Sequence, residues 1–255
     1  MSPELETALE AAKAAADISR RYFRSNLEVT TKADRTPVTR ADVECEEAIR
    51  DVVLGRFPDH GFFGEETGSS ARESANLWLV DPIDGTKAFV RGYPFFSTQI
   101  ALMRDGVLVL GVSSAALFDE LAWAESGQGA WLNDARLHVS ETERLASAAL
   151  STGNLKSLAA SDGWKALGEI VTGLDRVRGY GDFYHYHLLA AGRIDAVVES
   201  DVSVLDVAAL AVIVQEAGGV FTDLNGRPPD LDTRSVLAAN PPLHTELLKR
   251  LRGYV

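Results

Sequence analysis

The chain has 255 residues with the apolar and charged balance of a globular protein, and its formal net charge is −12 at neutral pH. This acidity excludes nonspecific binding to nucleic acid, which requires basic surface. The single cysteine, Cys45, excludes an intrachain disulfide and favours a reducing, cytoplasmic setting. The sequence has no apolar stretch long enough to span a bilayer and no signal-peptide layout, so we expect no membrane partner.

The N-terminal part predicts two helices with a polar segment between them. Apolar residues at helical spacing predict a first helix from Pro3 to about Arg24. The stretch from Val29 to Val38 indicates an exposed turn or hairpin. A second helix follows, and Thr39 and Asp42 have the spacing of a capping box at its start. The apolar run 77–80 then predicts a short buried strand, followed by a helical turn at 87–90.

From Phe95 onward the apolar pattern alternates with a period of two, and Gly-containing turns separate the segments. This predicts an antiparallel sheet of strands at 95–103, 107–112, 120–124 and 130–132. Strands and helices then alternate, with strands at 148–152, 194–199, 220–222 and 236–239 and helices at 164–172, 182–191, 206–217 and from about 241. The pattern predicts a layered α/β chain whose halves, residues 1–145 and 146–255, pack as one body.

Two carboxylates, Asp81 and Asp84, directly follow the apolar run 77–80. The carbonyl of Ile83 lies between them, and Gly85 opens the helical turn that follows. Carboxylate and carbonyl oxygens at a strand end suit a hard cation, and a helix start suits a phosphate. The segment therefore indicates a site where cations and a phosphate meet.

Each acidic candidate also has an ordinary structural interpretation. Asp84 could form an Asx turn, and Asp42 could serve only in its capping box. Asp182 and Asp206 each stand where they could cap a helix. Glu65 could be a solvated loop charge. Only the combination of these residues favours a functional site.

Three motifs in this order resemble the inositol monophosphatase superfamily, whose members are magnesium-dependent, lithium-sensitive phosphatases. The motifs are Gly64-Glu65-Glu66, Asp81-Pro82-Ile83-Asp84-Gly85-Thr86, and Leu205-Asp206-Val207-Ala208-Ala209 followed by Glu216-Ala217-Gly218-Gly219. The resemblance spans nearly the whole chain. It implies an α/β (α+β) fold, the layered αβαβα sandwich of the inositol monophosphatase and sugar phosphatase type, and a homodimer.

Within the superfamily the sequence is most similar to the histidinol-phosphate phosphatase branch. The similarity lies in Lys87-Ala88-Phe89 after the central motif, in Asp182 within Arg178-Gly179-Tyr180-Gly181-Asp182-Phe183-Tyr184, and in the absence of a Trp-Asp pair from the last motif. The branch often has an aromatic residue before the last aspartate, where this chain has Leu205. The resemblance implies hydrolysis of L-histidinol phosphate to L-histidinol in histidine biosynthesis. Two alternatives remain: an inositol or broad sugar-phosphate phosphatase, and a non-catalytic binding relative, which would have broken metal ligands.

The resemblance also implies the metal ligands, for two or three Mg²⁺ ions. Glu65, Asp81 and the carbonyl of Ile83 would hold one ion. Asp81 would bridge to a second ion held by Asp84 and Asp206. A third, weaker ion would lie near Glu65 and the adjacent Glu66.

The remaining implied roles concern water and substrate. Asp42 and Thr86, with Glu65, would orient the attacking water, and the N–H groups of Gly85 and Thr86 would face the phosphate. Asp182 and Glu199 would pair with the ammonium group of histidinol phosphate. The histidines at 185 and 187 are expected to be packed or solvated, not ligands.

Overall fold

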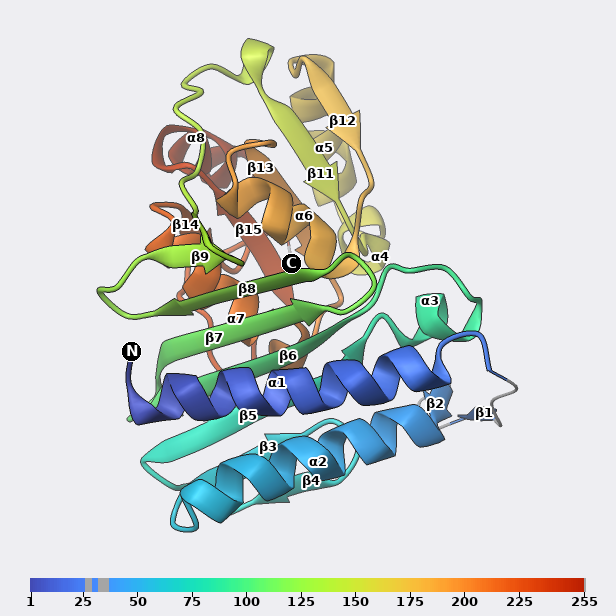
Figure 1. The fold of residues 1–255 in the computed structure, drawn as a ribbon. Coiled ribbons are helices and arrows are strands. Elements are labelled where there is room, and N and C mark those ends of the chain that lie inside the picture. Colours follow the sequence, from blue (N-terminus) through green and yellow to red (C-terminus); the bar gives the residue numbers. More distant parts are fainter. Residues whose placement is uncertain (26–28, 32–36, 255) are drawn as a thin grey trace.

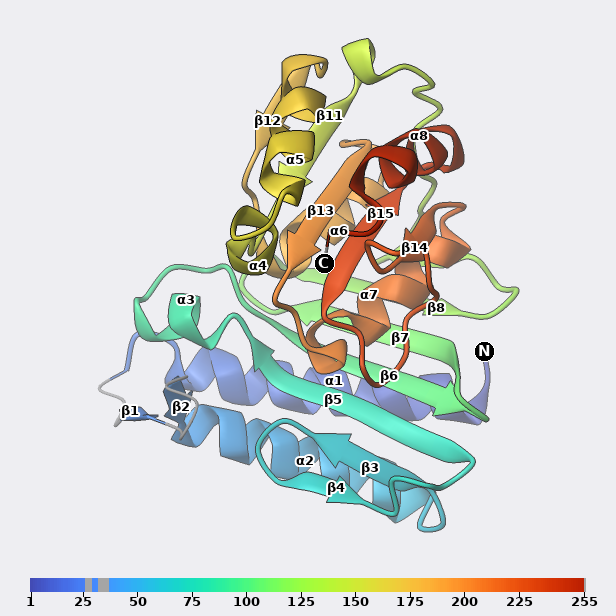
Figure 2. The same ribbon diagram turned by 180° about the vertical axis from the view of Figure 1, so that it is seen from behind.

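The computed structural model describes residues 1–25, 29–31 and 37–254. Its helices and strands stack in five layers, helix–sheet–helix–sheet–helix (Figures 1 and 2). The predicted αβαβα sandwich is therefore confirmed. Within the described residues, no helix combines the length and the apolar character needed to cross a membrane.

The larger sheet has eight strands and is antiparallel except where β3 runs parallel to β5. Its order is β10 (Ala135–Arg136), β9 (Ala130–Leu132), β8 (Glu120–Glu125), β7 (Val107–Ala115), β6 (Ser97–Arg104), β5 (Asn76–Asp84), β3 (Gly61–Gly64), β4 (Gly68–Ser70). The four strands predicted after Phe95 are all present, with small shifts at their ends. The strand predicted at 77–80 is longer than expected and includes both aspartates of the central motif.

The smaller sheet has five strands. Its order is β12 (Arg176–Arg178), β11 (Ala149–Thr152), β13 (Ala196–Ser200), β15 (Ser235–Ala239), β14 (Val220–Thr222). β11 runs parallel to both of its neighbours, whereas β15 is antiparallel to β13 and β14. The larger sheet uses residues 61–136 and the smaller one residues 149–239, while the division into two halves at residue 145 stays a prediction.

The helices form the two outer layers and the middle layer of the stack. α1 (Pro3–Tyr22) and α2 (Arg40–Arg56) cover one face of the larger sheet, and α6 (Asp182–Ala190) and α7 (Val204–Glu216) lie between the sheets (Figure 1). The far face of the smaller sheet is covered by α4 (Lys156–Ala159), α5 (Gly163–Thr172) and α8 (Pro241–Leu251) (Figure 2). A short α3 (Thr86–Val90) follows β5, and a 3₁₀ turn spans Leu145–Ser147.

The central strands bury both of their faces, which explains their continuous apolar runs. In β5, Leu77 and Leu79 join the core between the sheets, whereas Trp78 and Val80 join the core under α1 and α2. In β13, Val197 and its neighbours at 196 and 198 divide in the same way between two cores. Alternate side chains of a strand point to opposite faces, so each central strand joins two layers.

The segments that precede α2 and α7 can be compared with the sequence predictions. The segment from Val29 to Val38 contains β1 (Val29–Thr31) paired antiparallel with β2 (Pro37–Thr39), and the predicted turn at 32–36 lies outside the described residues. The helix predicted to start at Asp206 starts earlier, because Ser203 is its N-cap. The alternative that Asp206 is the N-cap of this helix was wrong; Asp206 is the third helical residue and completes a capping box with Ser203.

Candidate active site

A bulge in β5 turns both aspartates of the central motif to one side. Asp81 lies opposite Gln99 of β6, and Asp84 lies opposite Ser97, so β5 has one more residue than β6 in this interval. Residues three apart on a regular strand would point to opposite faces, and an extra residue reverses that relation. The bulge therefore allows the two carboxylates to share one site.

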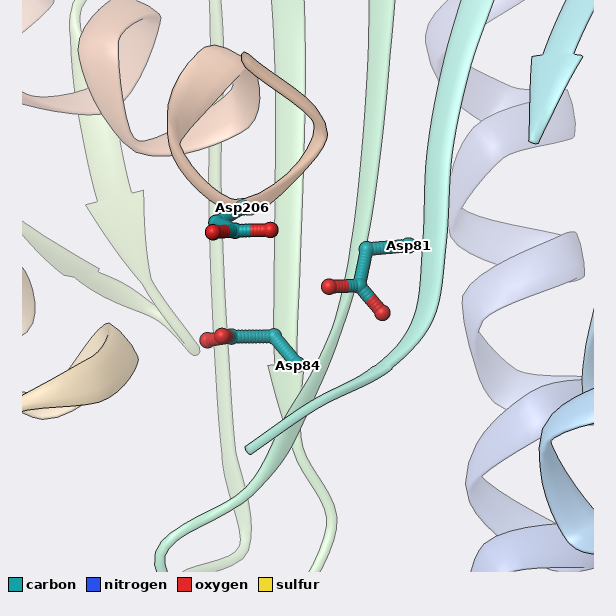
Figure 3. Close-up of side chains that lie close together, drawn as sticks. All are labelled: Asp81, Asp84 and Asp206. Atoms are coloured by element: carbon teal, nitrogen blue, oxygen red, sulfur yellow. The ribbon is translucent and has the colours of Figure 1, made fainter. Parts of the chain in front are cut away.

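Asp206 joins these carboxylates from the first turn of α7 (Figure 3). Asp81, Asp84 and Asp206 each offer a carboxylate oxygen, and these oxygens all lie within 4.8 Å of one another. Asp81 and Asp84 are buried and Asp206 is partly buried. An all-oxygen donor set with clustered negative charge fits a hard cation such as Mg²⁺.

A cleft of about 360 Å³ connects this cluster to the surface. Its walls include nearly every residue predicted for the site: Glu65, Ile83, Gly85, Thr86, Asp182 and the three clustered aspartates. Ile83 is held in place from two sides, because its N–H donates to Asp81 Oδ1 (3.0 Å) and its carbonyl accepts from the Thr86 hydroxyl (3.0 Å). The loop between the two aspartates is thus ordered by its own side chains.

Asp42 has both of the roles considered for it. Its Oδ2 accepts from the backbone N–H and the hydroxyl of Thr39 (2.7 and 2.6 Å), which forms the predicted capping box of α2. Its Oδ1 lies 3.2 Å from the Thr86 hydroxyl, at the start of α3. Burial raises the pKa of Asp42, and the hydrogen bonds from Thr39 oppose that rise. Asp42 therefore joins the start of α2 to the start of α3, whose first residue, Thr86, lines the cleft.

Gly85 permits a close approach that a larger residue would prevent. Its φ of 88° lies in the left-handed region, and a Cβ atom there would lie 2.5 Å from the carbonyl oxygen of Phe95. The next residue, Thr86, begins α3. The chain can therefore turn from the second aspartate directly into the helix.

Electrostatic repulsion makes this site costly without a cation. Burial raises the pKa of Asp81 well above its usual value, and Glu65, Asp84 and Asp206 raise it further. Burial likewise raises the pKa of Asp84, with Asp182 and Asp206 adding to it. The pKa of Asp206 rises to about 7, chiefly through burial, although the Ser203 N–H opposes the shift. Such shifts are typical of functional carboxylates.

Asp182 lies where a substrate could reach it. The N-cap of α6 is Gly181, so the alternative that Asp182 merely caps this helix was wrong. Asp182 instead adopts a φ of 45° and faces Asp84, Asp206 and Glu199 across a small cavity. Burial of its carboxylate and the charge of Glu199 raise the pKa of Asp182 to about 6.

Glu199, predicted to act with Asp182, already has three protein donors. Its Oε2 accepts from His185 (3.0 Å) and the Tyr186 hydroxyl (2.7 Å), and its Oε1 accepts from the N–H of Asn154 (3.1 Å). Burial raises the pKa of Glu199, but these partners, His185 first, lower it overall. Glu199 lines the same small cavity as Asp182, with fewer oxygen lone pairs left for a ligand.

The two histidines of α6 are packed, as predicted. His185 is fully buried against Glu199, and His187 is buried with its ring nitrogens near Glu120 and Ser113. Neither of them belongs to the acidic cluster.

Sequence analysis missed Glu46 and Asn154. The buried carboxylate of Glu46 accepts from the N–H groups of Glu66 (2.7 Å) and Thr67 (2.8 Å), which fixes the loop that carries Glu65. Glu46 lies four residues after Asp42 on α2, so helical spacing placed both on one face and could have revealed it. Asn154 lines the cleft from the end of β11, and we see no sequence signal for it.

The αβαβα sandwich and the carboxylate cluster at the end of its central strand define a layered phosphatase of the sugar-phosphatase type. The chain belongs to the inositol monophosphatase family, whose model its sequence matches over residues 1–255. It is 42% identical over 262 residues to a histidinol-phosphatase from Mycobacterium tuberculosis, with 98% of each chain covered. It is 36% identical over 249 residues to a histidinol-phosphatase from Chlorobaculum parvum, with 97% of this chain and 96% of the other covered.

A solved inositol monophosphatase from Zymomonas mobilis also matches the fold. It has a TM-score of 0.88 and 34% sequence identity, and the match covers 98% of this chain and 99% of the other. Sequence and structure therefore place the chain in one family, and its relatives have two different names.

Proposed function

We propose that this protein is a Mg²⁺-dependent phosphate monoester hydrolase whose substrate is L-histidinol phosphate. The observation that carries the reaction class is the concentration of acid in the cleft, where Glu65, Asp81, Asp84 and Asp206 converge. A phosphate dianion would be repelled by these carboxylates, so it can enter only with cations that neutralise them. Bound Mg²⁺ supplies that neutralisation and lowers the pKa of a coordinated water.

The chain's own residues supply orientation. Asp81 is close enough to Glu65, Asp84 and Asp206 to feel the charge of each, so it would hold a cation together with these carboxylates. The Thr86 hydroxyl, placed between Asp42 Oδ1 and the Ile83 carbonyl, can pass a proton toward Asp42. The N–H groups of Gly85 and Thr86 at the start of α3 can contact the phosphate.

We assign substrate choice to Asp182 and Glu199, which line the same small cavity as Asp84 and Asp206. Histidinol phosphate carries an ammonium group, and Asp182 is a carboxylate in the same cleft with a raised pKa of about 6. An ammonium there would be attracted to Asp182 and, more weakly, to the already bonded Glu199. The two relatives named histidinol-phosphatase support the same substrate.

The alternative is an inositol or broad sugar-phosphate phosphatase, which the similarity to the Zymomonas mobilis inositol monophosphatase favours. Phosphate release from L-histidinol phosphate, myo-inositol 1-phosphate and glycerol phosphate with Mg²⁺ separates the two. We expect the highest kcat/KM for histidinol phosphate, and a kcat/KM at least about 100-fold lower for the Asp84→Asn variant prepared in parallel. An equal or higher kcat/KM for the inositol ester would overturn the substrate assignment. A non-catalytic relative would release no phosphate from any of the three.

Three further properties belong to this proposal. A second and a third Mg²⁺ would bind beside the first, the third near Glu65 and Glu66. Lithium would inhibit by occupying one cation position, and the enzyme would act as a cytoplasmic homodimer. The family resemblance supports each of these properties.

A further inference from the structure

A series of hydrogen-bonded polar side chains, most of them buried, runs from Asp84 along one face of the larger sheet, from strand to strand, to Glu120 of β8. Its links lie at hydrogen-bond separations of 3.4, 2.7, 3.0, 2.9 and 2.9 Å. It crosses β5, β6, β7, α6 and β8 through Asp84, Ser97, Gln99, Ser113, His187 and Glu120. Ser97, Gln99 and Ser113 are each at most 1% exposed, so water does not compete for these contacts.

The sheet register brings these side chains together. Ser97 lies opposite Asp84 across β5 and β6, and Ser113 lies opposite Gln99 across β6 and β7. Ser97 and Gln99 are two residues apart on β6 and so point to the same face. Three polar side chains on one buried face of a central sheet destabilise the fold unless each of them forms hydrogen bonds.

The amide of Gln99 sets the direction of hydrogen-bond donation along this series of side chains. Its Nε2 lies 2.7 Å from Ser97 Oγ and 3.0 Å from Ser113 Oγ, and an amide nitrogen can only donate. Both hydroxyls therefore accept from Gln99, and each has its own hydrogen left to donate outward. Ser97 Oγ lies 3.4 Å from Asp84 Oδ2 and Ser113 Oγ lies 2.9 Å from His187 Nε2, so each hydroxyl has an acceptor for its hydrogen.

The reverse orientation of the Gln99 amide fits the site less well. Its oxygen would then take the hydrogens of both serines, and Ser97 could no longer donate to Asp84. A carboxylate that holds a cation is commonly kept in its orientation by a hydrogen-bond donor on its second oxygen. The observed orientation supplies this donor, while Gln99 Oε1 is buried without a partner in the described part of the chain.

The outer end of the chain is fixed in the same way. If Ser113 donates to Nε2 of His187, the ring carries its hydrogen on Nδ1, which lies 2.9 Å from Glu120 Oε2. The Glu120 side chain is 18% exposed and borders a surface groove between α1 and β8. The chain thus ends at a carboxylate that water can reach.

We propose that Ser97 and Gln99 are positioning residues that hold the Asp84 carboxylate oriented for a cation. The inference rests on the proposed metal site and goes beyond it, because neither residue touches the cleft. Gln99 acts through both serines, and His187 with Glu120 anchors the far end. Outer partners of metal ligands commonly change metal affinity by about 10–100-fold when removed.

Calorimetric titration of the metal-free protein with Mn²⁺, without substrate, tests the inner end of the chain. We expect Ser97→Ala to weaken the binding of one cation by about tenfold. Gln99→Met should weaken the same cation, although it leaves Asp84 and Ser97 in place. Ser19→Ala is the matched control, since it removes an equally buried hydroxyl that bonds only within α1.

The outcomes separate this inference from the proposed function. If the unmodified protein binds no Mn²⁺, the metal site itself fails. If it binds Mn²⁺ and Ser97→Ala binds it equally well, the site stands and the positioning role is overturned. Equal losses in Ser97→Ala and Ser19→Ala would also overturn it, because the effect would then be general loosening.

A second measurement tests the direction of the chain without any metal. Long-range ¹H–¹⁵N spectra of the metal-free protein should show His187 with its proton on Nδ1 and a bare Nε2. In Gln99→Met, Ser113 no longer accepts from an amide, so it can accept from Nε2 and the ring can change tautomer. A His187 proton on Nε2 in the unmodified protein would overturn the assigned direction.

Discussion

At the scale of single residues, Asp84 and Asp206 should behave as one unit. They come from β5 and α7 and share one cluster with Asp81. Removing an outer partner of a metal ligand lowers activity by up to about 100-fold. Asp84→Asn and Asp206→Asn each change a ligand itself, so we expect each to lower kcat/KM by at least about that factor. The double variant should be little worse than either single one, because both lose the same cation. Near-normal turnover in a folded single variant would remove that residue from the metal site.

Asp182 should control KM for the charged substrate. A hydrogen bond between charged groups is worth about 1.5–3 kcal/mol, so Asp182→Asn should raise KM for histidinol phosphate about tenfold or more. KM and kcat for glycerol phosphate, which lacks the ammonium, should change little in the same preparation. Equal losses on both esters would make Asp182 a structural residue and would favour a broader phosphatase.

The sequence predicted that the residues of the central motif lie together in one site, because that motif is local. Asp81, Ile83 and Asp84 lie within four positions, and one bulge sets their geometry. Glu199 was harder, since what limits it comes from His185 and Tyr186, which bond to it across the fold. A carboxylate's free lone pairs depend on tertiary neighbours, and no pattern around position 199 reveals them.

At the scale of elements, α2 governs the loop that presents Glu65. Glu46→Ala would remove the buried carboxylate that accepts from the N–H groups of Glu66 and Thr67, so the loop would lose both of these hydrogen bonds. We expect lower thermal stability together with weaker cation binding, measured by melting and by Mn²⁺ titration. Glu47→Ala, at the exposed neighbouring position, is the control and should change neither.

The element boundaries show which local sequence signals predict where a helix or strand begins. The capping box of Thr39 and Asp42 was predicted and found. Ser203 and Asp206 have the same spacing, and the same rule would have placed the start of α7 correctly. The bulge in β5 could not be foreseen, because it depends on how β6 pairs on each side of Pro82. A spacing rule can therefore locate a helix start, as it did for α2, whereas the sheet register required the folded structure.

At the scale of the whole molecule, the apolar periodicity predicted a layered α/β chain. The order of the motifs carried the family resemblance that implied the five-layer sandwich. The continuous apolar runs of β5 and β13 follow from burial on both faces, and a five-layer stack requires such strands. The sequence did not predict β3 and β4, which are short and contain glycine at three of their seven positions. Such strands have too little apolar pattern to stand out, and their pairing with β5 defines them.

The stability of the whole protein should depend jointly on pH and on Mg²⁺. In the metal-free protein the pKa values of Asp81 and Asp84 are raised, and that of Asp206 is about 7. The folded state therefore binds more protons than the unfolded chain, whose aspartates titrate near pH 4. Since stability falls with pH wherever the folded state binds more protons, the metal-free protein should lose stability between about pH 4 and pH 7.

Mg²⁺ should reverse this loss, because it binds the ionised carboxylates of the folded state. At about 100 times its dissociation constant, one cation adds about 2.7 kcal/mol to the free energy of unfolding. Thermal melts with and without Mg²⁺ should therefore differ more at about pH 8 than at about pH 5, where protons compete for the same oxygens. Asp84→Asn should reduce the difference at the higher pH. Coincident melts at both pH values, or a larger effect of Mg²⁺ in acid, would contradict a cation site built from these carboxylates.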